Sequence, residues 1–279
     1  MHRFGGVFFG ATARPVPGDR GVRQSRPMEL ILVTLASAMA GFVDAIVGGG
    51  GLILVPALFA TYVAATPATL LGTNKSASVW GTLFALWQYS KRIELPWRKL
   101  AYVVLVTWVG SWLGAYALTL MSPDFLRKLL PAVMLLVLGY TLLRKDLGHT
   151  HAPRWQGRRE TLVMCAIGFV IGCYDGFFGP GTGSFFVFLL VRVMGYDFLY
   201  ASACTKLLNA TSNASALALF TWQGHVWWHL TLALAVANVA GSLLGTRMAL
   251  KHGTGFVRIM FICVVSALVL KTGYDAFGR

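Results

Sequence analysis

Apolar stretches separated by short polar segments cover most of this chain. They run at about 28–47, 52–65, 70–89, 100–120, 126–143, 161–178, 183–195, 198–222, 228–250 and 255–274. Many approach the roughly 20 residues that an α-helix needs to span a bilayer. Their length and the lack of strict alternation favour helices over the short strands of a membrane barrel. The pattern predicts an all-α polytopic membrane protein with 8–10 membrane segments.

The chain repeats itself with an offset of 131 residues, which carries Asp44 to Asp175 and Lys75 to Lys206. The same offset relates further pairs: Gly41 and Gly172, Gly48 and Gly179, Gly50 and Gly181, Trp97 and Trp228, Gly110 and Gly241, Ser111 and Ser242, Gly114 and Gly245, Phe125 and Phe256, and Arg127 and Arg258. Self-similarity at a fixed spacing indicates an internal duplication. We therefore predict membrane repeats at 28–146 and 161–279, joined by a polar connector at 147–160.

The first 27 residues differ from the rest of the chain in composition. Their arginines lie among glycines and prolines: Arg3, Arg14, Arg20, Arg23 and Arg26. A segment of this kind buries too little apolar surface to form a core. We expect 1–27 to be a disordered basic tail, with Met28 as an alternative start of the chain.

Composition supports the membrane class, because 56% of the residues are hydrophobic, 12% are charged and the mean hydropathy is +0.65. Soluble proteins have roughly 45–50% apolar and about 25% charged residues. The net charge of +14 comes largely from Lys and Arg in short segments between apolar stretches, such as 91–99 and 144–159. This distribution is typical of topology signals beside an anionic membrane surface. We expect a lipid bilayer as partner, a multi-pass location in the cell (cytoplasmic or inner) membrane, and no nucleic acid as partner.

Glycine-rich stretches interrupt the apolar pattern once in each half. They consist of Gly48, Gly49, Gly50 and Gly51 in the first half, and of Gly179, Pro180, Gly181, Thr182 and Gly183 in the second. Glycine and proline break helices, and lipid tolerates irregular backbone only where protein buries it or water reaches it. We predict discontinuous or re-entrant helices whose exposed N–H groups suit an anion. Close helix packing at small residues is the alternative.

Polar residues form a stripe along each of the two stretches that hold a buried lysine. In the second half the stripe has spacings of four, three and four: Ser202, Lys206, Asn209 and Asn213. These spacings place the four side chains on one face of a helix. A thinner stripe in the first half contains Asn74, Ser78 and Thr82 beside Lys75.

An ammonium group at the middle of a bilayer costs about 2.5–3.5 kcal/mol, so Lys75 and Lys206 need a carboxylate, water or an anion. Asp44 and Asp175 are the obvious partners. Three interpretations stay open. The pairs only fix helix register, or they neutralise each other while glycine N–H groups and asparagines hold the ligand. In the third, each lysine binds the anion and Asp44 or Asp175 carries a coupling proton.

At these residues the chain resembles the TauE/SafE family of sulfite and organosulfur-anion exporters, also called the 4-toluene sulfonate uptake permease family. The glycine-rich segment after Asp44, the Thr-Asn-Lys element at 73–75, and DGFFGPGTGSF at 175–185 followed by Lys206 are similar to its two signature regions. The resemblance covers about 28–277 and implies transport of a small, sulfur-containing anion. Gly49 faces Pro180 and Asn74 faces Thr205 between the halves, so the two half-sites should differ chemically.

We therefore expect a secondary transporter that moves sulfite or an organosulfonate by alternating access, with an anion channel or a non-transporting scaffold as alternatives. The expected substrate site comprises Asn74, Lys75, Thr205, Lys206, Asn209, Asn213, Gly48, Gly49, Gly50, Gly51, Gly179, Gly181, Thr182 and Gly183, with Asp44 and Asp175 for charge pairing or proton coupling. No metal, cofactor or enzymatic activity is expected. The pattern favours inverted over parallel repeats, because a two-fold axis in the membrane plane suits alternating access. It leaves the coupling ion and the oligomeric state undefined.

Overall fold

The computed structural model describes residues 27–126, 129 and 151–277, and within these ranges the regular structure is entirely helical. The helices are α2 (Pro27–Val47), α3 (Gly51–Thr61), α4 (Pro67–Ser90), α5 (Trp97–Thr119), α7 (Gly157–Phe177), α8 (Thr182–Arg192), α9 (Phe198–Trp222) and α10 (Trp228–Phe277). The all-α prediction is confirmed. The predicted tail, most of the apolar stretch at 126–143 and the first part of the connector lie outside the described residues.

Several helices have the length and the composition of membrane spans. Four qualify among the described residues: Pro27–Ile46, Trp97–Thr119, Gly157–Phe177 and Trp228–Gly253. The helices α4 and α9 are equally long, at 24 and 25 residues, but they carry polar stripes and most of their side chains are buried. The protein is therefore a multi-pass membrane protein, with its two most polar helices inside the bundle.

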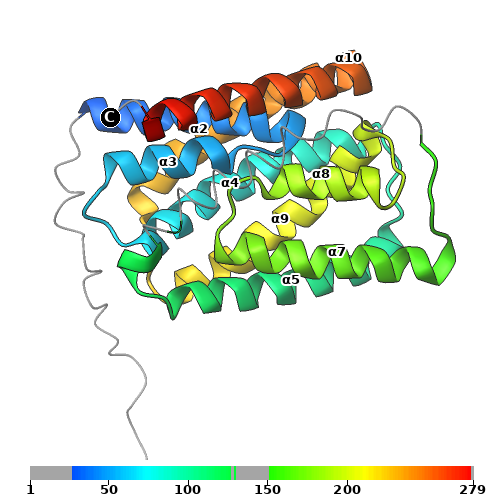
Figure 1. Cartoon of the computed structure of the whole chain (residues 1–279), viewed down its shortest axis with the longest axis horizontal. Coiled ribbons are helices and arrows are strands. Elements are labelled where there is room, and N and C mark those ends of the chain that lie inside the picture. Colours follow the sequence, from blue (N-terminus) through cyan, green and yellow to red (C-terminus); the bar gives the residue numbers. More distant parts are fainter. Residues whose placement is uncertain (1–26, 127–128, 130–150, 278–279) are drawn as a thin grey trace, which may run out of the picture.

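Helices from the two halves of the chain pack against each other (Figure 1). Helix α5 lies along α7 at the bottom of the view, and α2 lies along α10 at the top. Helices α4 and α9 contact each other between these layers. Each outer layer therefore combines one helix from the first half with one from the second.

Close contacts at glycine join the outer helices. A methyl group on Gly110 of α5 would overlap the carbonyl of Phe169 on α7, and one on Gly241 of α10 would overlap the carbonyl of Ala38 on α2. Small residues permit such close approach of two helices. The two contacts are related by the offset of 131 residues, with the roles of the two halves exchanged.

Two helices in the bundle are short because glycine interrupts the chain. Helix α2 ends at Val47, Gly48 adopts a φ of 80°, and α3 begins at Gly51. Likewise α7 ends at Phe177, and α8 begins at Thr182. Helices α3 and α8 have 11 residues each, about half of what a crossing requires. Each half therefore contains a helix that begins inside the bundle.

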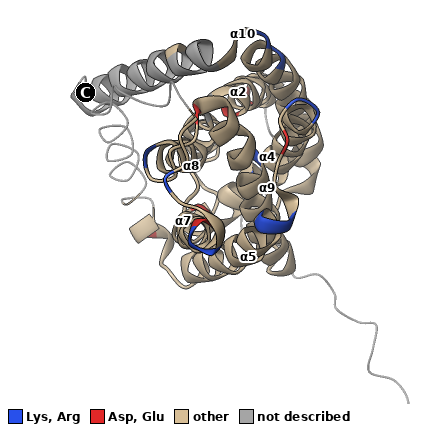
Figure 2. Ribbon diagram, turned by 90° about the vertical axis from the view of Figure 1, so that its right-hand side faces the viewer, with Lys and Arg blue, Asp and Glu red and all other residues tan. Residues whose placement is uncertain are grey.

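The chain passes through the two halves in opposite directions. Helix α2 starts at the left-hand end of the molecule and α7 starts at the right-hand end (Figure 1). Lys and Arg gather at the right-hand end, where α4 and α8 finish and α5 and α7 begin (Figure 2). This basic end is defined by the segments around 91–99, 154–159, 192 and 247–251.

Candidate functional site

The two glycine breaks meet inside the bundle. A methyl group on Gly48 would overlap the backbone of Gly183, and one on Gly183 would overlap Gly48. The N–H group of Ser184 donates a hydrogen bond to the carbonyl oxygen of Gly48 over 3.0 Å. Gly51 lies against Pro180 in the same contact. The beginnings of α3 and α8 are thus held together by backbone, with no side chain between them.

A sealed ion pair lies beside this contact. The Nζ atom of Lys75 on α4 is 2.6 Å from Oδ1 of Asp175 on α7, and both side chains are 2% exposed. The other carboxylate oxygen, Oδ2, is buried and has no hydrogen-bond partner. Burial of a single charge is very costly, so each of these residues depends on the other. The lysine of one half is thus paired with the aspartate of the other half.

The second ion pair also joins the two halves, but it is looser. The Nζ atom of Lys206 on α9 is 3.5 Å from Oδ2 of Asp44 on α2, and it also donates to the main-chain oxygen of Asp44. Lys206 is fully buried, whereas the side chain of Asp44 is 15% exposed. Thr82 and Asn209 complete its surroundings with long hydrogen bonds of 3.4 and 3.5 Å to the carboxylate. Asp44 is therefore the more accessible carboxylate.

A small central cavity of about 20 Å³ lies between the two pairs and the two breaks. It is lined by Asp44, Gly48, Gly51, Asn74, Lys75, Ser78, Asp175, Gly179, Gly183, Asn209 and Asn213. This volume is enough for about one water molecule. Asn74 contributes a buried Oδ1 atom that has no hydrogen-bond partner. The cavity therefore collects charged and polar groups from α2, α4, α7 and α9.

The structure brings together most of the residues that the sequence pointed to. Those that do not line the central cavity are Gly49, Gly50, Gly181, Thr182, Thr205 and Lys206. Lys206 reaches the site through Asp44, whereas the Thr182 hydroxyl bonds to Gly179 over 2.8 Å, within its own break. Ser78 lines the cavity although we did not include it in the expected site. Its position in the polar stripe of α4 was the signal for it.

Paired charges and irregular backbone at the centre of apolar helices are the features of a membrane transporter. Ionisable residues within membrane segments mark substrate and ion pathways. Helices that start near the midplane, with their N-termini directed at the site, recur in secondary transporters. The fold and the site therefore define the class as a multi-pass membrane transporter.

The chain belongs to the TauE/SafE sulfite exporter family, whose sequence model matches residues 33–272. It is 36% identical over 256 residues to the probable membrane transporter protein YfcA of Escherichia coli K12, covering 91% of this chain and 93% of the relative. It is 33% identical to the probable membrane transporter protein ORF9 of Sinorhizobium sp, covering 87% and 91%. A probable membrane transporter protein of Haemophilus influenzae is 31% identical, covering 88% and 95%. No solved structure gives a significant match.

Proposed function

We propose that this protein is a secondary transporter that moves sulfite or an organosulfonate across the cytoplasmic membrane by alternating access. The observation that carries the proposal is the pair of buried Lys–Asp contacts, each joining one half to the other, where the glycine breaks meet. The family supplies the chemical class of the substrate, because its members are described as sulfite exporters.

Binding of a sulfur oxyanion requires the site to open. The central cavity of about 20 Å³ has room for roughly one water molecule, and a sulfur atom with three oxygens is larger. Because Lys75 and Asp175 lie at its wall, separation of their charges exposes an ammonium group to an entering anion. An anion bound there replaces the carboxylate as the partner that a buried cation needs. The two glycine breaks add backbone N–H groups at the first turns of α3 and α8.

The looseness of the Lys206 pair assigns the coupling proton to Asp44. Its carboxylate is partly exposed and 3.5 Å from the ammonium group, whereas that of Asp175 is sealed at 2.6 Å. A carboxylate that water can reach exchanges protons more readily than one enclosed with a cation. Protonation of Asp44 would release Lys206 to the anion, which couples the two movements.

Inverted repeats would provide the two access states. Their support is the opposite direction of α2 and α7, together with contacts such as Gly110–Phe169 and Gly241–Ala38 that exchange the halves. Rocking of one half against the other about the glycine contact would open the site alternately to each side. By the positive-inside rule, the basic end faces the cytoplasm.

Anion flux into proteoliposomes tests this function. The panel is sulfite, thiosulfate, sulfoacetate, taurine and sulfate, with wild type and Lys206→Gln compared. We expect saturable flux of at least one sulfur anion, and a loss of about 10- to 100-fold in the variant, since a hydrogen bond to a charged group is worth roughly 1.5–3 kcal/mol.

Lys99→Gln is the matched control, because Lys99 forms an ion pair with Glu160 over 2.6 Å but its side chain is 45% exposed and lies outside the site. It should keep wild-type flux. Folding of each variant is checked by its elution and melting profile. Absence of flux for every anion in folded wild-type protein contradicts the proposal.

A further inference from the structure

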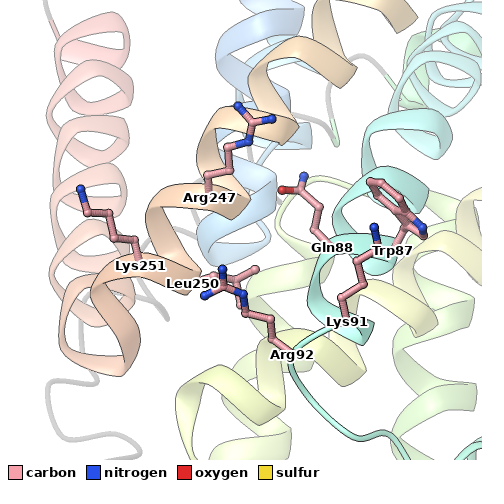
Figure 3. Close-up of a pocket in the computed structure, with 7 residues that line it drawn as sticks. All are labelled: Trp87, Gln88, Lys91, Arg92, Arg247, Leu250 and Lys251. Atoms are coloured by element: carbon pink, nitrogen blue, oxygen red, sulfur yellow. The ribbon is translucent and has the colours of Figure 1, made fainter.

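A larger pocket, separate from the central cavity, opens at the basic end between α4 and α10 (Figure 3). We call it the basic pocket; its volume is about 560 Å³. Four cationic side chains surround it: Lys91 and Arg92 directly after α4, and Arg247 and Lys251 on α10. Trp87 and Gln88 complete the α4 side. It has no lining residue in common with the central cavity.

The charges of the basic pocket are not balanced by the part of the protein that the structure describes. None of its four cations forms an ion pair with a described carboxylate, and no described carboxylate lines it. Lys91 lies over the ring of Trp87, with Nζ 3.4 Å from the ring centroid. The Nε2 atom of Gln88 is buried without a hydrogen-bond partner. Four like charges around one pocket repel each other, so an anion would stabilise the arrangement.

An apolar groove continues from the basic pocket along the same two helices. It has a volume of about 510 Å³ and is lined by Trp80 and Phe84 of α4 and by Trp228, Leu232 and Val236 of α10, among others. Phe84 precedes Lys91 by seven residues, which is about 10 Å along a helix. The cationic part thus lies at the end of the helices and the apolar part lies toward their middle.

This order of charges and apolar surface matches a lipid. Trp87 is 53% exposed next to the cations, as expected of an aromatic residue at the headgroup level of a membrane. Basic pockets between membrane helices at the cytoplasmic side bind anionic headgroups. We propose that the basic pocket binds the phosphate of an anionic phospholipid, whose acyl chain lies in the groove between α4 and α10.

A soluble phosphate or oxyanion presents the same charge to these four cations, but it has no use for the apolar groove. Titration of the purified full-length protein, followed by native mass spectrometry, separates the two sources. The probes are phosphatidylglycerol, phosphatidylcholine and inorganic phosphate. We expect phosphatidylglycerol to bind at least about 10-fold more tightly than either of the other two, because only it combines the anion with the chain.

The decisive variant is Arg92→Gln/Arg247→Gln, compared with Arg158→Gln/Arg159→Gln. The second variant removes the same charge from the same end of the molecule but outside the pocket. Each cation near a membrane surface contributes about 5-fold to the affinity for an anionic lipid, so we expect about a 25-fold loss in the first variant and little change in the second. If the first variant does not fold, Lys91→Gln/Lys251→Gln takes its place.

Equal loss in the pocket and control variants would overturn the proposal, because it would show that net charge alone attracts the lipid. Equal affinity for phosphatidylglycerol and phosphatidylcholine would overturn it as well. Binding of inorganic phosphate as tight as that of the anionic lipid would assign the pocket to a soluble anion instead.

Discussion

Lys75 and Lys206 occupy related positions but have different surroundings. Lys75 is 2.6 Å from a carboxylate as deeply buried as itself, whereas Lys206 shares its ammonium group between the main-chain oxygen and the carboxylate of Asp44. The sequence indicated four buried charges and named their possible partners. It could not show that each lysine pairs with the aspartate of the other half, because that choice depends on how α4 and α9 pack between the outer layers.

Asp44→Asn should separate anion movement from proton movement. The amide keeps the shape of the carboxylate but cannot bind or release a proton in this range, so we expect anion exchange to persist while acceleration by a pH gradient disappears. Flux is measured in proteoliposomes with and without an imposed gradient.

Asp175→Asn is the comparison for that experiment. Its partner Lys75 is sealed, so loss of the carboxylate leaves a buried cation and should lower the melting temperature, in line with about 3–5 kcal/mol for one partner of a buried pair. If gradient acceleration survives in Asp44→Asn and vanishes in Asp175→Asn, the proton is carried by Asp175.

At the scale of elements, the breaks between α2 and α3 and between α7 and α8 bring both halves into backbone contact. The expected stretches at 52–65 and 183–195 begin within one residue of α3 and α8, because glycine and proline mark helix ends locally. They end later than the helices do, since a run of apolar residues does not by itself show where the backbone turns. The contact of one break with the other depends on tertiary packing, and no local pattern contains it.

Gly48→Ala tests the glycine contact. Its φ of 80° disfavours any side chain, and a methyl group would also overlap Gly183. Strain in the left-handed region costs about 1–2 kcal/mol, and the overlap adds to it. We expect a lower melting temperature and strongly reduced flux, measured on the same preparation.

Gly224→Ala provides the control for backbone strain alone, because Gly224 has a φ of 77° and open space around its Cα atom. It should lose little stability and retain flux. Similar losses in both variants would mean that the backbone angle, and not the contact with Gly183, is what matters at Gly48.

For the whole molecule, the arrangement of the halves decides how the site could open to both sides. Repetition and charge pattern could be read from the sequence, but the direction of the second half could not. The number of crossings before it depends on whether the glycine-interrupted segments pass through the membrane or turn back.

Inverted repeats predict that equivalent loops lie on opposite sides of the membrane. In a background without cysteine, Glu94→Cys after α4 and Thr221→Cys at the end of α9 should react with a membrane-impermeant thiol reagent from opposite sides. Both positions are exposed. Labelling from the same side in intact cells and in inverted vesicles would indicate parallel repeats.

Counterflow tests most directly the claim that two Lys–Asp pairs form one alternating site. Proteoliposomes loaded with unlabelled sulfite, or with another anion found to be transported, receive a trace of the labelled anion outside. A carrier predicts transient accumulation of label above its outside concentration in wild type and Lys99→Gln, and none in Lys206→Gln. Flux that runs down its gradient without such accumulation would contradict alternating access and identify a channel.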